Sequence, residues 1–121
     1  MKIIFSATAL LLLLSCSAVK LPETNQYQLS AYSVKQWAGK PSRNTLLVTP
    51  PEAAPGYETN AMRYIKKPYQ LETFAKNAWA SPPADMLEPL LVQSLQRSGR
   101  FYAVSSGAYT QGSNYRLDTE V

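Results

Sequence analysis

The sequence is poor in the residues that most often build catalytic and metal sites. Its 121 residues include no histidine and a single cysteine. Without histidine, a Ser-His-Asp or Cys-His catalytic group is excluded, and a zinc or copper site has almost no ligands. The glycines stand singly rather than in a phosphate-binding loop, and no serine has the surroundings of a nucleophile elbow. We therefore expect no catalytic residue, no metal site and no cofactor.

Long charged tails and internal repeats are missing as well. The formal net charge is +4, and the basic residues are scattered between Lys20 and Arg116 with Lys66-Lys67 as an adjacent pair. A nucleic-acid-binding protein usually gathers its basic residues on one face, so we expect no nucleic-acid partner. Aromatic residues are plentiful, with eight tyrosines. Because they suit interfaces as well as cores, the composition favours a binding or assembly protein over an enzyme.

The N-terminus carries a short apolar run. Lys2 precedes the stretch Ile3–Leu14, which is interrupted by Ser6 and Thr8. About 12 residues are too few for a transmembrane helix, which needs about 20. A positive residue, a short apolar run and small residues after it are typical of a secretory signal.

The end of this run, Leu13-Leu14-Ser15-Cys16, resembles the lipobox of bacterial lipoproteins. That resemblance implies cleavage before Cys16 and attachment of diacylglycerol to its thiol, with acylation of the new N-terminal amine. The alternative is a buried cysteine in an ordinary signal or a short hydrophobic anchor. We assign residues 1–15 to a signal peptide, 16–26 to a lipidated tether and 27–121 to the domain. Ser17 after the cysteine favours delivery to the outer membrane, facing the periplasm.

Strand patterns alternate with turn residues along the domain. Five segments have the alternating or β-rich pattern of a strand: Tyr27–Ala31, Thr45–Thr49, Met62–Lys67, Phe101–Ser105 and Tyr115–Val121. Residues 33–44 are predicted to be a loop, in which Trp37 folds back as a cap on the core. The stretch Tyr69–Ala78 fits a helical stripe and a strand face equally well.

A long helix is predicted over Pro82–Gly99, where leucines 87, 91 and 95 form an apolar stripe. Either Ser81 or Asp85 is expected to cap its start, and Gly99 to close its end. Pro89 should kink the second turn if the helix begins at Pro82. Strands around one long helix predict an α/β or α+β domain built on one mixed sheet.

Four stretches together resemble the ABC-type transport auxiliary lipoprotein family, of the paraquat-inducible protein C type. They are LLVTPPEAAPGYETNAMRY, KPYQLETFAKNAWASPPADMLEPLLVQSL, SGRFYAV and YRLDTEV, in that order and spacing. The resemblance implies a three-layer fold similar to anticodon-binding domains and the N-terminal domain of TolB. It also implies that Tyr69–Ala78 is a strand. Family members continue beyond the strand at Tyr115, so we expect C-terminal elements of the fold to be missing here.

The resemblance implies a non-catalytic function in lipid transport. The expected partners are an MCE-type protein and an ABC permease and ATPase, in a system that moves phospholipids or other hydrophobic molecules across the Gram-negative envelope. The resemblance is also compatible with a homo-oligomer. Cys16 is the one site residue that the resemblance carries over. The alternatives are a stand-alone envelope scaffold and a periplasmic enzyme, which would need a pocket with strongly perturbed carboxylates.

Overall fold

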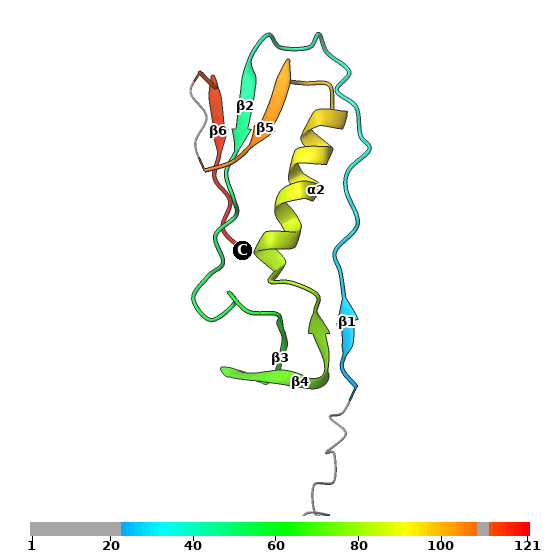
Figure 1. Ribbon diagram of the computed structural model, residues 1–121, viewed down its shortest axis with the longest axis vertical. Helices are drawn as coiled ribbons and strands as arrows, with labels where there is room; N and C mark the ends of the chain where they lie inside the picture. Colours follow the sequence, from blue (N-terminus) through cyan, green and yellow to red (C-terminus); the bar gives the residue numbers. More distant parts are fainter. Residues whose placement is uncertain (1–22, 109–111) are drawn as a thin grey trace, which may run out of the picture.

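The computed structural model describes residues 23–108 and 112–121, and it shows an elongated α/β molecule (Figure 1). Within these ranges the chain forms six strands and one helix. In chain order they are β1 (Asn25–Tyr27), β2 (Thr45–Val48), β3 (Ala61–Lys67), β4 (Gln70–Trp79), α2 (Pro83–Arg97), β5 (Ala103–Ser106) and β6 (Tyr115–Leu117). No helix in the described part of the chain is both long and apolar enough to cross a membrane.

The strands form two separate three-stranded sheets, so the expectation of a single sheet is wrong. One sheet has the order β1-β4-β3, with β1 parallel and β3 antiparallel to β4. The other has the order β5-β2-β6, and both outer strands are parallel to β2. The sheets separate because β3 finds its partner in the next segment of the chain, whereas β2 takes both partners from segments that follow the helix.

The hairpin of β3 and β4 resolves the segment that the pattern left open. Residues 70–79 are a strand, as the resemblance implied, and Ile65 lies directly opposite Leu71 in the register. Pro68 and Tyr69 make the turn, and Tyr69 has a φ of 65°. A proline followed by a residue with positive φ is the arrangement of a type II turn, in which glycine or asparagine usually takes the second place.

The helix matches its prediction closely, except at its cap. Pro83 occupies the first turn, and Gly99 follows the end of the helix with a φ of 64°, the left-handed conformation that a closing glycine adopts. The N-cap residue is Pro82, and no side chain bonds to the free N–H groups. The prediction that Ser81 or Asp85 caps the helix is therefore wrong.

The core lies between α2 and the sheet β5-β2-β6. Leu46, Val48 and Val104 are buried at its centre, and Val48 has no exposed surface. Five half-buried apolar residues pack around them: Leu91, Val92, Leu95, Phe101 and Leu117. On its other side the helix is flanked by residues 28–44, which run alongside it without regular structure (Figure 1). Leu91 and Leu95 of the predicted leucine stripe thus face the small parallel sheet.

Three strands differ from their predicted bounds by two residues or more. The first strand is Asn25–Tyr27 rather than Tyr27–Ala31, because its partner in β4 runs over Asn77–Trp79. The fifth begins at Ala103 rather than Phe101. The last alternating run is a strand over three residues only, followed by an isolated bridge between Glu52 and Glu120.

Candidate functional site

Residues 28–44, here called the strap, are fixed to the C-terminal half of α2 by their backbone. The N–H of Ser33 donates to Ser94 Oγ at 2.9 Å, and the N–H of Trp37 donates to the carbonyl oxygen of Ser98 at 2.8 Å. Farther along, the N–H of Ser42 donates to the carbonyl oxygen of Arg100 at 2.8 Å. The last carbonyl groups of a helix lack partners within it, and the bond from Trp37 satisfies one of them at the C-cap residue Ser98.

Two arginines at the end of the helix stack on aromatic rings of the strap. The guanidinium carbon of Arg97 lies 4.9 Å from the ring centroid of Tyr32, and that of Arg100 lies 4.9 Å from the ring centroid of Trp37. Cations within about 6 Å of a ring face are attracted to it. We call Tyr32, Trp37, Arg97 and Arg100 the aromatic–arginine strip.

The strip lies open to solvent rather than within the core. Trp37 is 54% exposed and Tyr32 36% exposed, so the prediction that Trp37 caps the core is wrong. The chain also turns tightly over the indole, since a side chain at Gly39 would collide with Trp37 Nε1. A hollow of about 400 Å³ adjoins the ring, with Leu95 and Phe101 among its lining residues.

The composition of the strip is that of a protein-binding surface. Tryptophan, tyrosine and arginine are the residues most enriched among those that dominate binding energies. Here they are already held in place by cation–π contacts and by the strap's hydrogen bonds, so little conformational entropy remains to be lost on binding. No local pattern predicts this surface, because Tyr32 and Arg97 are far apart in the chain.

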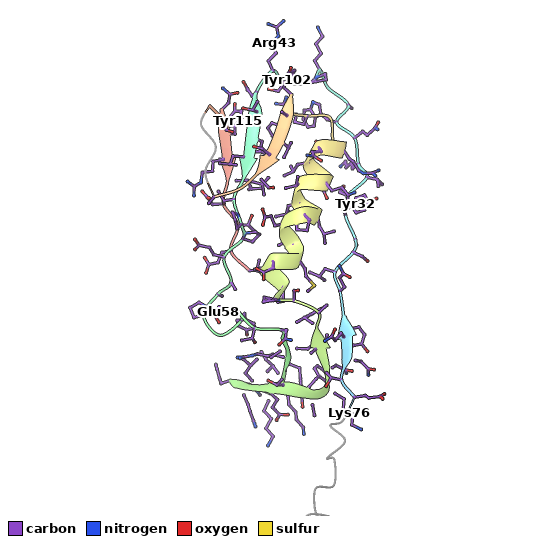
Figure 2. All side chains as sticks on the ribbon, viewed as in Figure 1. Tyr32, Arg43, Glu58, Lys76, Tyr102 and Tyr115 are labelled. Carbon is purple, nitrogen blue, oxygen red and sulfur yellow. The ribbon has the colours of Figure 1, made fainter. Side chains whose placement is uncertain are left out.

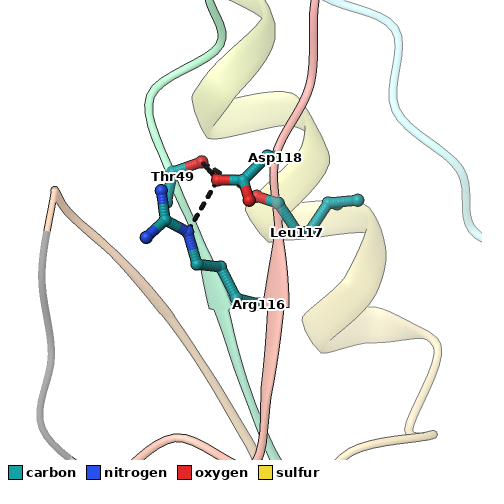
Figure 3. A network of polar contacts seen from close by, with 4 residues as sticks. All are labelled: Thr49, Arg116, Leu117 and Asp118. Atoms are coloured by element: carbon teal, nitrogen blue, oxygen red, sulfur yellow. Dashed lines mark hydrogen bonds and ion pairs between the residues drawn. The ribbon is translucent and has the colours of Figure 1, made fainter.

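A polar cluster at the ends of β2 and β6 is the other concentration of functional groups (Figure 3). The hydroxyl of Thr49 donates to Asp118 Oδ1 at 2.7 Å, and Arg116 Nε donates to the same oxygen at 2.7 Å. These two hydrogen bonds, Thr49 first, lower the pKa of Asp118 below its usual 3.8. A cleft of about 600 Å³ lies beside the cluster.

The chemistry of this cluster is that of a structural tie. A carboxylate with a lowered pKa stays ionised at neutral pH and is unsuited to act as a general acid. The Thr49 hydroxyl donates its proton to that carboxylate, and the Thr49 N–H donates to the carbonyl oxygen of Leu117 at 3.0 Å. The cluster therefore joins the end of β2 to the end of β6. Across residues 23–108 and 112–121, no group of acidic or cysteine side chains is arranged to hold a metal ion.

Cys16, the one site residue proposed from the sequence, lies outside the described residues. Its lipidation stays a prediction. The first described strand, β1, begins nine positions after it at Asn25. The structure thus defines where the chain enters the domain.

Comparisons with known proteins identify relatives of the whole described domain. A family model described as "ABC-type transport auxiliary lipoprotein component" matches residues 23–121. The crystal structure of protein XCC0632 from Xanthomonas campestris, described there as a DUF330 protein, is similar with a TM-score of 0.65 and 28% identity. The match covers 80% of this chain and 53% of that one.

A second crystal structure, of an uncharacterized protein, supports the fold. It matches with a TM-score of 0.56 and 22% identity over 82% of this chain and 57% of that one. The chain thus spans a little over half the length of both solved structures. No curated protein matches it in sequence.

Proposed function

This chain belongs to the family of ABC-type transport auxiliary lipoprotein components, and on that premise we propose that it serves an MCE-type transport system. In this proposal it is a non-catalytic, lipid-anchored accessory protein that faces the periplasm. The system would move phospholipids or other hydrophobic molecules across the Gram-negative envelope. The observation that carries the proposal is the family match over residues 23–121, which includes every described element.

The lipid anchor is the second part of the proposal. The apolar run and the lipobox-like Leu13–Cys16 sequence support attachment at Cys16, and Ser17 supports sorting to the outer membrane. Several acyl chains hold a protein on a membrane stably, whereas one chain is marginal. Fatty-acid labelling tests this directly: the wild type should incorporate label and fractionate with the outer membrane, and Cys16→Ala should do neither. Label on the Cys16→Ala protein would contradict the assignment.

The aromatic–arginine strip is where we place the contact with the transporter. The aromatic rings of the strip are exposed, and cation–π contacts with these rings fix the arginines in place. This arrangement supports a protein partner rather than a small substrate. Truncating a residue that dominates an interface typically costs at least about 2 kcal/mol, or roughly 30-fold in affinity. Trp37→Ala and Arg97→Glu should therefore each abolish copurification with the MCE-type protein.

A matched control exists within the same chain. Arg63 lies 5.7 Å from the ring centroid of Tyr57, which is 46% exposed, so this pair resembles the strip but belongs to another surface. Tyr57→Ala should leave copurification unchanged. Arg97→Glu keeps the backbone hydrogen bonds of the strap, and an unchanged unfolding temperature would show that the fold is intact. Copurification with other envelope proteins and never with transporter components would favour a stand-alone scaffold instead.

A further inference from the structure

The β3–β4 hairpin carries the net positive charge of the domain. Residues 61–79 contain four basic side chains and one acidic side chain, a net charge of +3. The remaining residues between 23 and 121 contain six basic and seven acidic side chains, a net charge of −1. Glu72, the acidic residue of the hairpin, accepts hydrogen bonds from the hydroxyl of Tyr64 at 2.5 Å and from Gln70 Nε2 at 3.3 Å. The lysines of the hairpin are exposed: Lys66, Lys67 and Lys76.

The same hairpin exposes large apolar side chains that no described segment covers. Ile65 is 69% exposed, and Tyr69 is fully exposed at the turn. Leu71 and Phe74 are 42% and 41% exposed. Exposed apolar side chains mixed with lysines are typical of surfaces that lie in the interface of a bilayer, where aromatic rings sit among the headgroups.

The turn presents its ring at a conformational cost. Tyr69 has a φ of 65°, in the left-handed region that a residue with a side chain adopts rarely. The ring is fully exposed, so no packing contact offsets the conformational cost of this backbone geometry. Glycine would suit the turn better, so the tyrosine has no apparent role in the fold of the described domain.

The hairpin also lies at the end where the chain enters the domain. β1 runs parallel to β4 with Asn25 beside Asn77, so the chain enters β1 from the side of the hairpin. Figure 1 shows the hairpin across this end of the molecule, and Figure 2 shows Lys76 there and Tyr102 at the opposite end. Asn25 lies nine positions after Cys16, a separation of at most about 30 Å when the chain is fully extended.

We infer that the β3–β4 hairpin rests on the anionic lipid surface in which the protein is anchored. The inference relies on the proposed attachment at Cys16, because that anchor keeps the hairpin within about 30 Å of the bilayer. Three exposed lysines are attracted to an anionic surface, and exposed Ile65 and Leu71, which lie opposite one another in the register, offer apolar contact with the bilayer interface. The contact orients the domain, so that the aromatic–arginine strip lies away from the membrane.

Lysine labelling with a membrane-impermeant amine reagent tests the inference on the mature, lipidated protein. We compare the protein in phosphatidylglycerol-containing vesicles with the protein in detergent, by mass spectrometry of each lysine. Lys66, Lys67 and Lys76 should lose reactivity several-fold in the vesicles. The exposed Lys35 and Lys40 of the strap are internal controls, and they should react equally in both. High salt or phosphatidylcholine vesicles should restore the reactivity of the hairpin.

The outcomes separate this inference from the proposed anchor. Failure of the protein to float with vesicles would reject lipid attachment at Cys16. Flotation with equal reactivity of all five lysines would reject the hairpin contact alone. Protection of the hairpin only when the transporter is added would also overturn it, since the hairpin would then bind protein. The fluorescence that Leu71→Trp adds should be quenched by brominated phosphatidylglycerol, whereas the fluorescence that Tyr102→Trp adds should not; equal quenching of both would contradict the orientation.

Discussion

Replacing Pro89 with alanine should stabilise the protein. Pro89 lies inside α2, seven positions after the N-cap residue Pro82, and its side chain is exposed. Because proline has no N–H, the carbonyl group of Asp85 lacks its usual helical donor, and the pyrrolidine ring crowds that same carbonyl. Alanine restores the hydrogen bond and removes no buried contact.

The expected gain follows from two opposing effects. A proline inside a helix costs about 3 kcal/mol relative to alanine. Proline also restricts the unfolded chain, and losing that restriction costs about 0.4–1 kcal/mol. The difference is a gain of about 2 kcal/mol in the free energy of unfolding. For a domain of about 100 residues, that raises the unfolding temperature by about 8–16 °C.

Thermal and urea unfolding, followed by circular dichroism, measure the effect. Pro83→Ala is the matched control, because Pro83 lies in the first turn, where a proline loses no intrahelical bond. Its unfolding free energy should fall by about 0.4–1 kcal/mol, because only the restriction that proline places on the unfolded chain is lost. A Pro89→Ala protein that is no more stable than Pro83→Ala would refute the reasoning. It would mean that the helix had already relaxed around the proline without cost.

Two further predictions concern the core and the polar tie. Leu46→Ala should lower the free energy of unfolding, measured in urea, by about 2–5 kcal/mol, because Leu46 is buried in the core and only 5% exposed. Val34 is 70% exposed, so Val34→Ala should have little effect. Hydrogen bonds from Thr49 and Arg116 lower the pKa of Asp118, so its contribution to stability is present above pH 3.8 and lost as the pH falls through its lower folded pKa. Asp118→Asn should therefore lower the unfolding temperature at neutral pH but flatten its fall in acid; equally steep acid curves would contradict this.

The sequence predicted the elements where their signals are local. β2 is a short β-rich run ended by Pro50-Pro51, and α2 has a leucine stripe with a glycine after it, so both were found within a few residues. The N-cap was missed because Ser81 and Asp85 have the right chemistry on either side of the true start. A favourable residue type does not fix the backbone geometry that capping requires.

The pairing of strands was not predictable in the same way. Alternation indicates that a segment is a strand, but it does not choose its partner. Thr45 pairs with Ala103, and Leu46 with Tyr115, which are contacts across more than half of the described chain. The prediction of a single sheet is wrong for this reason, because no local pattern distinguishes two small sheets from one larger sheet.

The candidate surfaces were hidden for a related reason. Ser33 and Ser94 are separated by 61 positions, and no periodic pattern links a loop to the end of a later helix. The lysines looked scattered in sequence, yet the hairpin brings Lys66, Lys67 and Lys76 into one 19-residue unit that protrudes from the domain. Charge scattered along a chain can therefore be concentrated in space by a single antiparallel turn.

The two proposed surfaces together constrain the geometry of a complex. The hairpin lies near the start of α2, and the strip lies beside Ser94 and Ser98 near its end. A 15-residue helix is about 22 Å long, so a domain resting on its hairpin would hold the strip roughly one helix length above the lipid surface. A partner confined to the headgroup region of the same membrane could not reach it. The strip therefore suits a protein that projects well into the periplasm, and a crosslinker at Trp37 should capture such a projecting domain rather than a membrane-embedded one.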